Sequence, residues 1–163
     1  MKNNSFTVAV LGAGNIGSAV IERLLEVDNE VLNLSLSKVL VSDLSKERDI
    51  DGGLLTTDFD EILNDENIDL VIEVLGGVEP GKGYIKDLLE SGKSVITANK
   101  DIVADCGSEL IQIAQKNNVC LYFEAAVAAG IPVLKPLIES LRGEELTRAV
   151  SYTHLRAHET HTN

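Results

Sequence analysis

The fold of this chain is decided by residues 6–17, whose sequence is FTVAVLGAGNIG. Residues 6–11 are apolar and rich in β-branched side chains, a composition typical of a buried parallel strand. The next segment, SAVIERLL at 18–25, places apolar residues at helical spacing. A strand, a glycine-rich turn and a helix in this order form the fingerprint of a dinucleotide-binding fold.

The six residues of the turn are the first candidates for cofactor binding: Gly12, Ala13, Gly14, Asn15, Ile16 and Gly17. Gly12 permits a tight turn, Gly14 lets the backbone approach a pyrophosphate, and Gly17 lets the helix pack closely against the strand. The start of the helix would offer free N–H groups and the positive end of its dipole to the phosphates. Because glycine turns are common, a βα turn with a purely structural role is the alternative interpretation.

The composition fits one α/β domain and excludes some partners. The 163 residues are enough for a substantial core, and with 4% aromatic residues and no Trp that core must be aliphatic. Acidic residues outnumber basic ones, 26 to 14, for a net charge of −12. Nucleic acids and anionic membranes require a basic surface, so we expect neither as a partner.

The sequence also predicts a cytoplasmic location. Cys106 and Cys120 have neither disulfide-framework nor zinc-site spacing, and two isolated thiols are typical of a reducing compartment. Residues 1–5 lead directly into the first strand without the apolar region of a signal peptide. No apolar run approaches the roughly 20 residues that a membrane helix requires.

Strand and helix patterns alternate along the rest of the chain. We expect strands at 38–43, 54–57, 68–75, 94–98 and 119–123, and helices at 59–63, 80–92 and 107–117. The repeated alternation of strand and helix implies parallel strands joined by right-handed crossovers. This order predicts an α/β fold of the Rossmann type, a doubly wound, mainly parallel sheet with helices on both faces.

Ligands of such sheets bind beyond the carboxyl ends of the strands. The residues at those ends are Gly12 to Gly17, Asp43, Gly76, Gly77, Asn99, Lys100 and Glu124, and we expect them to share one crevice. The ammonium of Lys100 would there donate a hydrogen bond or a proton, with an ordinary surface lysine as the alternative. The small residues at 125–132 permit either close approach to a ligand or tight packing of the backbone.

Several motifs resemble those of the homoserine dehydrogenase family, in the same order. They are VSDLSK at 41–46, LGGVEP at 75–80, ITANK at 96–100, FEAAVAAGIP at 123–132 and KPL at 135–137. The similarity extends over about residues 5–150. Aspartate dehydrogenases and other Rossmann oxidoreductases share the glycine fingerprint, but we do not expect them to share the whole series.

The resemblance implies an enzyme that uses NAD or NADP to interconvert L-aspartate 4-semialdehyde and L-homoserine, in threonine and methionine biosynthesis. It further implies that Gly12 to Gly17 hold the pyrophosphate, that Asn99 and Lys100 lie near the nicotinamide, and that Lys100 is also catalytic. Gly76 and Gly77, within the LGGVEP motif, are expected to bind the cofactor as well. The family also binds a sodium ion through main-chain oxygens, which here would belong to Glu124, Val127, Ala129 and Ile131. Hard oxygen ligands from an irregular turn suit such a cation.

The preference between NAD and NADP is left open by the sequence. The family often has an arginine where this chain has Ser42, so the usual partner of a 2′-phosphate is missing. Asp43 would instead accept hydrogen bonds from a free ribose 2′-hydroxyl. Asp43 nevertheless lies further beyond Gly17 than the usual spacing of roughly 20 residues, and Lys46 and Arg48 remain candidates for binding a phosphate.

The chain departs from the family after residue 150, where its sequence is SYTHLRAHETHTN. We therefore predict an NAD(P)-binding domain at 1–150 and a non-family tail at 151–163, disordered or artefactual. His154, His158 and His161 have helical spacing that would permit a metal site, but a frayed polar terminus is the preferred interpretation.

The resemblance places the catalytic and dimerising region of a homodimer beyond this chain. This fragment alone is then expected to be inactive. The alternative hypothesis is a dinucleotide-sensing module without chemistry.

Overall fold

A computed structural model describes residues 5–26 and 33–145 of the chain. Within these residues the strands form one six-stranded parallel sheet of order β3-β2-β1-β4-β5-β6. The strands are β1 (Phe6–Leu11), β2 (Leu34–Leu40), β3 (Leu55–Thr56), β4 (Leu70–Glu73), β5 (Ser94–Thr97) and β6 (Leu121–Tyr122). This order is that of the Rossmann fold and confirms the predicted fold class.

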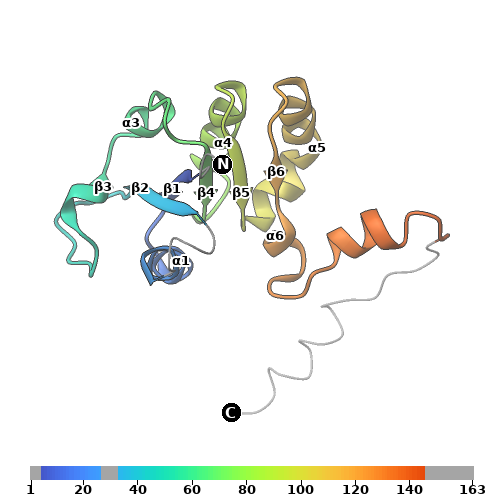
Figure 1. Ribbon diagram of the computed structural model, residues 1–163, viewed down its shortest axis with the longest axis horizontal. Coiled ribbons are helices and arrows are strands. Elements are labelled where there is room, and N and C mark those ends of the chain that lie inside the picture. The colour runs from blue at the N-terminus through green and yellow to red at the C-terminus, as the bar shows by residue number, and fades with distance from the viewer. Residues whose placement is uncertain (1–4, 27–32, 146–163) are drawn as a thin grey trace, which may run out of the picture.

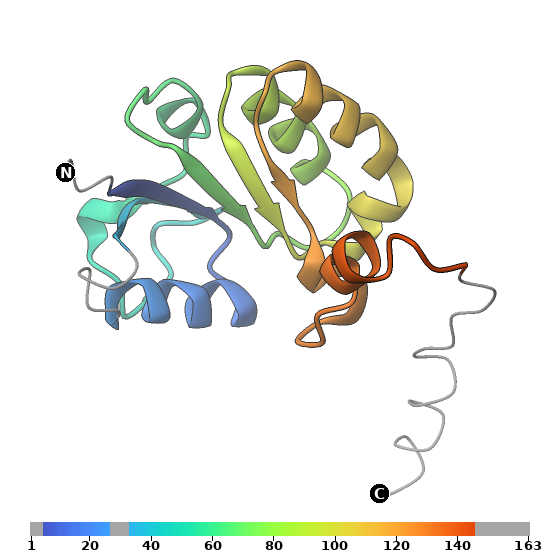
Figure 2. The ribbon, with the colours of Figure 1, turned by 45° about the vertical axis from the view of Figure 1, so that its right-hand side comes forward.

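Helices cover both faces of the sheet, but unequally. They are α1 (Asn15–Glu26), α3 (Asp60–Leu63), α4 (Gly81–Glu90), α5 (Lys100–Lys116) and α6 (Glu124–Ala128), with a short 3-10 turn at Gly52–Leu54 and a π-helical turn at Pro136–Ser140. Helix α1 lies on one side of the sheet, and α4 and α5 lie together on the other (Figure 1, Figure 2).

The alternation of side chains along β1 divides the core between the two faces. Ala9 and Leu11 belong to a cluster completed by apolar residues of α3, α4 and α5. Val10 packs instead with Ile21 of α1 and with Val39 of β2. All residues from Val8 to Leu11 are fully buried. The strand is therefore covered on both sides, which explains its continuous apolar sequence.

Several of the sequence-predicted elements were wrong in their boundaries. The second strand is Leu34–Leu40 rather than 38–43, because it pairs with β1 from Phe6↔Leu34 to Leu11↔Leu40 and both strands end together. Helix α5 begins at Lys100 rather than near 107. Its two parts are separated by non-helical backbone at Cys106 (φ −140°, ψ 15°), and the sequence indicated only the second part.

Helix α1 starts at Asn15, inside the glycine motif, whereas the sequence indicated Ser18. The strand predicted at 119–123 is confined to Leu121–Tyr122. Over residues 5–26 and 33–145 no helix combines the length and apolarity that a bilayer crossing demands. The segment 151–163, with its three histidines, lies outside the described residues.

Candidate functional site

The turn after β1 passes close to the end of β4. Gly12 has φ +104°, a conformation that L side chains rarely adopt, and its N–H donates to the carbonyl oxygen of Leu40 at 2.9 Å. A Cβ on Gly12 would lie 3.1 Å from the carbonyl oxygen of Val74. A side chain here would therefore push the turn away from the neighbouring strand.

The other two glycines of the motif differ in their surroundings. Gly17 is buried in the first turns of α1, and a Cβ there would lie 2.1 Å from the carbonyl oxygen of Gly12. Gly14 is exposed, and a Cβ on it would meet no atom within 4 Å. Gly17 is thus required for helix–strand packing, whereas Gly14 leaves open space at the start of α1. That space is where a pyrophosphate would approach the backbone.

A crevice of about 540 Å³ opens beside this turn, at the carboxyl edge of the sheet. It brings together predicted residues from three strand ends: Gly12, Ala13 and Gly14 after β1, Asp43 after β2, and Gly76 after β4. The expectation that all the strand-end residues share one crevice was wrong, because the residues at 15–17, Gly77, Asn99, Lys100 and Glu124 do not line it. It is also lined by residues that the sequence did not single out, among them Thr57, Pro80 and Tyr84. The other side of the glycine turn borders a second crevice of about 600 Å³, and Lys46 and Arg48 line both.

The loop after β2 is ordered around Asp43. The Asp43 carboxylate accepts hydrogen bonds from the Ser45 hydroxyl at 2.7 Å and the Ser45 N–H at 2.8 Å. These bonds, with smaller effects of Arg48 and Lys46, hold the pKa of Asp43 below its ordinary value. The Asp43 side chain is therefore an anion beside two cations, and its contact with a ribose stays a prediction.

Arg48 is folded back on the same loop. Its Nη1 donates to the carbonyl oxygens of Asp43 at 2.7 Å and Lys46 at 2.9 Å. Its Nε is buried and has no hydrogen-bond partner among the described residues. A buried donor of this kind is costly unless something accepts from it, so the loop fits an additional acceptor such as a ribose or phosphate oxygen.

Asn99 connects the ends of β4 and β5. Its Nδ2 donates to the carbonyl oxygens of Leu75 at 3.1 Å and Gly77 at 2.6 Å. Its Oδ1 accepts from the N–H groups of Asp101 and Ile102, which caps α5. The amide is thus used within the protein. Contact of Asn99 with a cofactor stays a prediction, and the structure adds the role of holding the Gly76–Gly77 loop.

Lys100 is the first residue of α5 and is exposed at the same edge of the sheet. It does not line the crevice described above, although its neighbour Asn99 is bonded to the loop that does. Lys100 follows the carboxyl end of β5, as the sequence analysis expected. Its catalytic role stays a prediction.

Sequence analysis missed Glu73, the last residue of β4. Its side chain is 0% exposed, accepts from the Leu75 N–H at 2.7 Å and is hydrogen-bonded to the Thr97 hydroxyl. Burial raises the pKa of Glu73, and the bonds from Thr97, Leu75 and Asn99 only partly oppose it. The sequence signal that could have revealed it is the single acidic residue in the otherwise aliphatic strand β4. In a strand covered on both faces, such a side chain must be buried and hydrogen-bonded.

The residues predicted to bind sodium lie around α6. Val127, Ala129 and Ile131 are exposed, and Ala129 has φ +52° in the turn that ends the helix. The Glu124 carboxylate accepts from the N–H groups of Val133, Leu134 and Lys135. Partial burial works against ionisation, but these bonds together hold the pKa of Glu124 below its ordinary value. Among the described residues no cluster of three His, Cys, Asp or Glu side chains offers a metal site, so a cation here would depend on main-chain oxygens.

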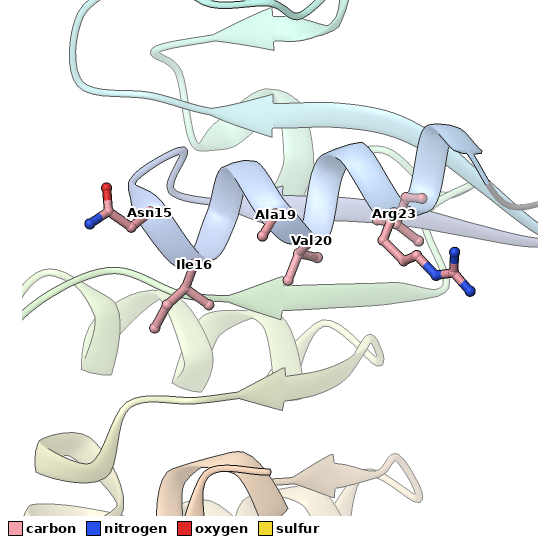
Figure 3. A pocket seen from close by; sticks show the side chains of 6 residues that line it. Asn15, Ile16, Ala19, Val20 and Arg23 are labelled. Atoms are coloured by element: carbon pink, nitrogen blue, oxygen red, sulfur yellow. The ribbon is translucent and has the colours of Figure 1, made fainter.

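An apolar groove of about 610 Å³ runs along α1 (Figure 3). It is lined by Asn15, Ile16, Ala19, Val20, Arg23 and Leu24. The Ile16 side chain is 60% exposed there. The groove contains none of the three glycines of the turn, so it is distinct from the crevice at the carboxyl edge. The side chains of Asn15 and Ile16 lie along the groove, so binding of a pyrophosphate to these residues would depend on their backbone.

The sheet order, the glycine turn and the crevice at the carboxyl edge together define a dinucleotide-binding Rossmann domain. The chain belongs to the homoserine dehydrogenase family, because the family model described as "Homoserine dehydrogenase, NAD binding domain" matches residues 12–124. This agrees with the resemblance carried by its motifs.

Individual relatives support the same family. The chain is 42% identical over 148 residues to homoserine dehydrogenase of Bacillus subtilis, which covers 86% of this chain and 34% of the relative. It is 45% identical over 147 residues to the homoserine dehydrogenase of Mycobacterium tuberculosis, and the match covers 86% of this chain and 33% of that relative. This chain thus spans about a third of the length of the curated relatives it matches.

Solved structures agree in fold. A homoserine dehydrogenase crystal structure from Thiobacillus denitrificans matches with a TM-score of 0.76 and 36% identity, over 85% of this chain and 33% of that one. The Staphylococcus aureus enzyme at pH 7.5 matches with a TM-score of 0.70 and 39% identity, over 77% and 33%.

Proposed function

We propose that this chain is the cofactor-binding portion of an enzyme that interconverts L-homoserine and L-aspartate 4-semialdehyde with NAD or NADP, a step of threonine and methionine biosynthesis. The observation that carries the proposal is the crevice between the glycine turn, Asp43 and Gly76, with Lys100 on the adjoining strand end. The names of the relatives at 42% and 45% identity support the substrate.

The residues present fit a dinucleotide. The open space at Gly14 and the buried, unpartnered Nε of Arg48, judged among the described residues, are both features that a bound phosphate or ribose would complete. When bound, the nicotinamide supplies or accepts a hydride. The glycine turn holds the pyrophosphate, and the loop of Asp43, Lys46 and Arg48 selects the ribose.

Lys100 carries the acid–base chemistry in this proposal. Reduction of an aldehyde leaves negative charge on the carbonyl oxygen, and an ammonium beside that oxygen stabilises the charge and donates a proton. The start of α5, where Asn99 fixes the backbone, holds Lys100 at the carboxyl edge of the sheet.

The proposal includes a sodium ion bound by the main-chain oxygens of Glu124, Val127, Ala129 and Ile131. The irregular backbone at Ala129 supports it, because an interrupted helix leaves carbonyl oxygens for a hard cation. The family resemblance further supports a homodimer for the longer protein. The free thiols of Cys106 and Cys120 support a location in the cytoplasm, where thiols stay reduced.

Titration of the 163-residue chain with NAD and with NADP tests the cofactor. A hundredfold excess over the dissociation constant should stabilise the fold by about 2.7 kcal/mol, measurable as a rise in melting temperature. A folded sample that neither dinucleotide stabilises would contradict the proposal. The substrate is tested separately, by assaying aspartate 4-semialdehyde reduction in a chain extended with the C-terminal two thirds of the Bacillus subtilis relative.

A further inference from the structure

Glu73 occupies a central place at the carboxyl edge of the sheet. In the strand register it is paired with Leu11 of β1 on one side and Thr97 of β5 on the other. Leu11 directly precedes the glycine turn, and Thr97 lies just before Asn99 and Lys100. Glu73 is therefore between the segment proposed to hold the pyrophosphate and the segment proposed to act on the substrate.

Hydrogen bonds connect the Glu73 carboxylate to both neighbouring loops. Oε1 accepts from the Leu75 N–H at 2.7 Å, and Oε2 is bonded to the Thr97 hydroxyl. The Thr97 Oγ1 accepts from the Asn99 N–H at 3.0 Å. The Asn99 amide then donates to the carbonyl oxygens of Leu75 and Gly77, which closes a ring of hydrogen bonds.

The start of α4 packs against this ring. A Cβ on Gly81 would lie 3.4 Å from Oε1 of Glu73 and 2.9 Å from Cδ1 of Ile102. The carboxylate is thus enclosed by β4, β5 and the starts of α4 and α5. Burial of a carboxylate is unfavourable, and at Glu73 the hydrogen bonds from Leu75 and Thr97 offset that cost. The side chain therefore acts on the two loops through these bonds rather than through apolar packing.

We propose that Glu73 is a positioning residue of the dinucleotide site. It keeps the Leu75–Gly77 loop and the Asn99–Lys100 junction in the one arrangement that accepts the cofactor. The inference rests on the proposed function, because it assigns to Glu73 the preorganisation of that site. Loss of the ring lowers the fraction of molecules whose loop can bind the cofactor. The apparent dissociation constant rises in inverse proportion to that fraction.

Glu73→Gln tests this with little change of shape, and Thr97→Val breaks the same ring from the other side. We expect each variant of the 163-residue chain to bind the preferred dinucleotide about tenfold more weakly, as if a tenth of the molecules kept the competent loop. Amide hydrogen exchange should become faster at Leu75 to Gly77. Thr97→Val carries the test should Glu73→Gln not fold.

Lys93→Met is the matched control. Lys93 directly precedes β5 and so lies at the amino edge of the sheet, away from the proposed site. It is 6% exposed, and its Nζ donates to the carbonyl oxygen of Asp65 at 2.8 Å. This variant also loses a buried charge, and we expect it to lower the melting temperature without changing dinucleotide affinity.

Undiminished affinity in Glu73→Gln and Thr97→Val would overturn the inference. A loss of affinity in Lys93→Met as large as theirs would do so too, since it would reduce the effect to lost stability. A folded wild-type chain that binds neither dinucleotide would overturn the proposed function and this inference with it.

Discussion

The backbone of Gly12 lies so close to Gly17 that a Cβ atom on Gly17 would be 2.1 Å from the Gly12 carbonyl oxygen. The two residues hold β1 and α1 at a separation that no side chain permits. Gly14, between them, has open space around its Cα. One motif therefore contains positions that serve packing and a position, Gly14, that we propose to serve a ligand, and mutation can separate the two kinds.

Gly17→Ala should destabilise the fold. The added methyl group must displace backbone rather than a flexible side chain, so we expect a loss of at least about 1–3 kcal/mol. Urea denaturation measures it. Gly83→Ala is the control, because a Cβ there meets nothing within 4 Å inside α4 and should stabilise the helix by about 0.5–1 kcal/mol. Equal stability of the Gly17 and Gly83 variants would contradict the packing role.

Gly14→Ala should leave the fold intact and weaken the cofactor. Its Cβ fits the free protein, but would project into the space where the pyrophosphate approaches the backbone. We expect a wild-type melting temperature and a dissociation constant for NAD or NADP raised about tenfold, or roughly 1.4 kcal/mol. Calorimetric titration gives both affinities, and unchanged binding would place the pyrophosphate elsewhere.

Asp43 and Lys46 should influence cofactor choice in opposite directions. Removing the Asp43 anion with Asp43→Asn takes away repulsion toward a 2′-phosphate, so the ratio of NADP to NAD affinity rises. Lys46→Gln removes attraction and the ratio falls. We expect the affinity ratio to change about fivefold in each direction, the effect of roughly 1 kcal/mol for a solvent-exposed charge pair. Titrations with both dinucleotides measure the ratio, and a shift in the same direction for both variants would contradict the assignment.

Glu73 should make the stability depend on pH with a definite sign. Burial raises its pKa in the folded protein, so the fold is stabilised by Glu73 below the ordinary pKa of 4.5 and loses that contribution as the pH rises through the raised value. The unfolding free energy of wild type minus that of Glu73→Gln should therefore fall over this interval.

Glu124→Gln is the control of opposite sign. The pKa of Glu124 is lowered, so its contribution is present above 4.5 and is lost as the pH falls through the lowered value. Urea midpoints measured across a pH series give both difference curves. A wild-type minus Glu73→Gln curve that rises with pH would show that Glu73 is not buried in the way described.

Lys100→Ala should separate chemistry from folding. Lys100 is exposed, so the variant of the 163-residue chain should keep its stability within about 0.5 kcal/mol and lose little dinucleotide affinity. In the extended chain it should lower kcat by about 10²–10⁴-fold, the range for a lost general acid. Lys116→Ala, at the other end of α5, is the control. Near-normal turnover by Lys100→Ala would refute the role, and turnover by the unextended chain would show that the catalytic groups are misplaced.

Much of the fold was predictable because its signals are local. The aliphatic run of β1, the glycine turn and the helical spacing of α1 stand within 20 residues of one another, and each reflects a steric or burial requirement of its own segment. The boundaries of β2 were not predictable in this way. They are set by pairing with β1, in which Leu34 to Leu36 take Phe6 to Val8 as partners and the register shifts at Ser37.

The candidate site divides along the same line. The sequence by itself determined which residues stand at strand ends, and hence that Gly12, Gly14, Asp43 and Gly76 would meet at one edge, because parallel strands bring their carboxyl ends together. Only the tertiary structure decided that Glu73 turns inward to hold both loops and that the Asn99 amide is used to fix Gly77. Hydrogen bonds of buried polar groups depend on which atoms lie within about 3 Å in space, and that proximity has no counterpart in local sequence.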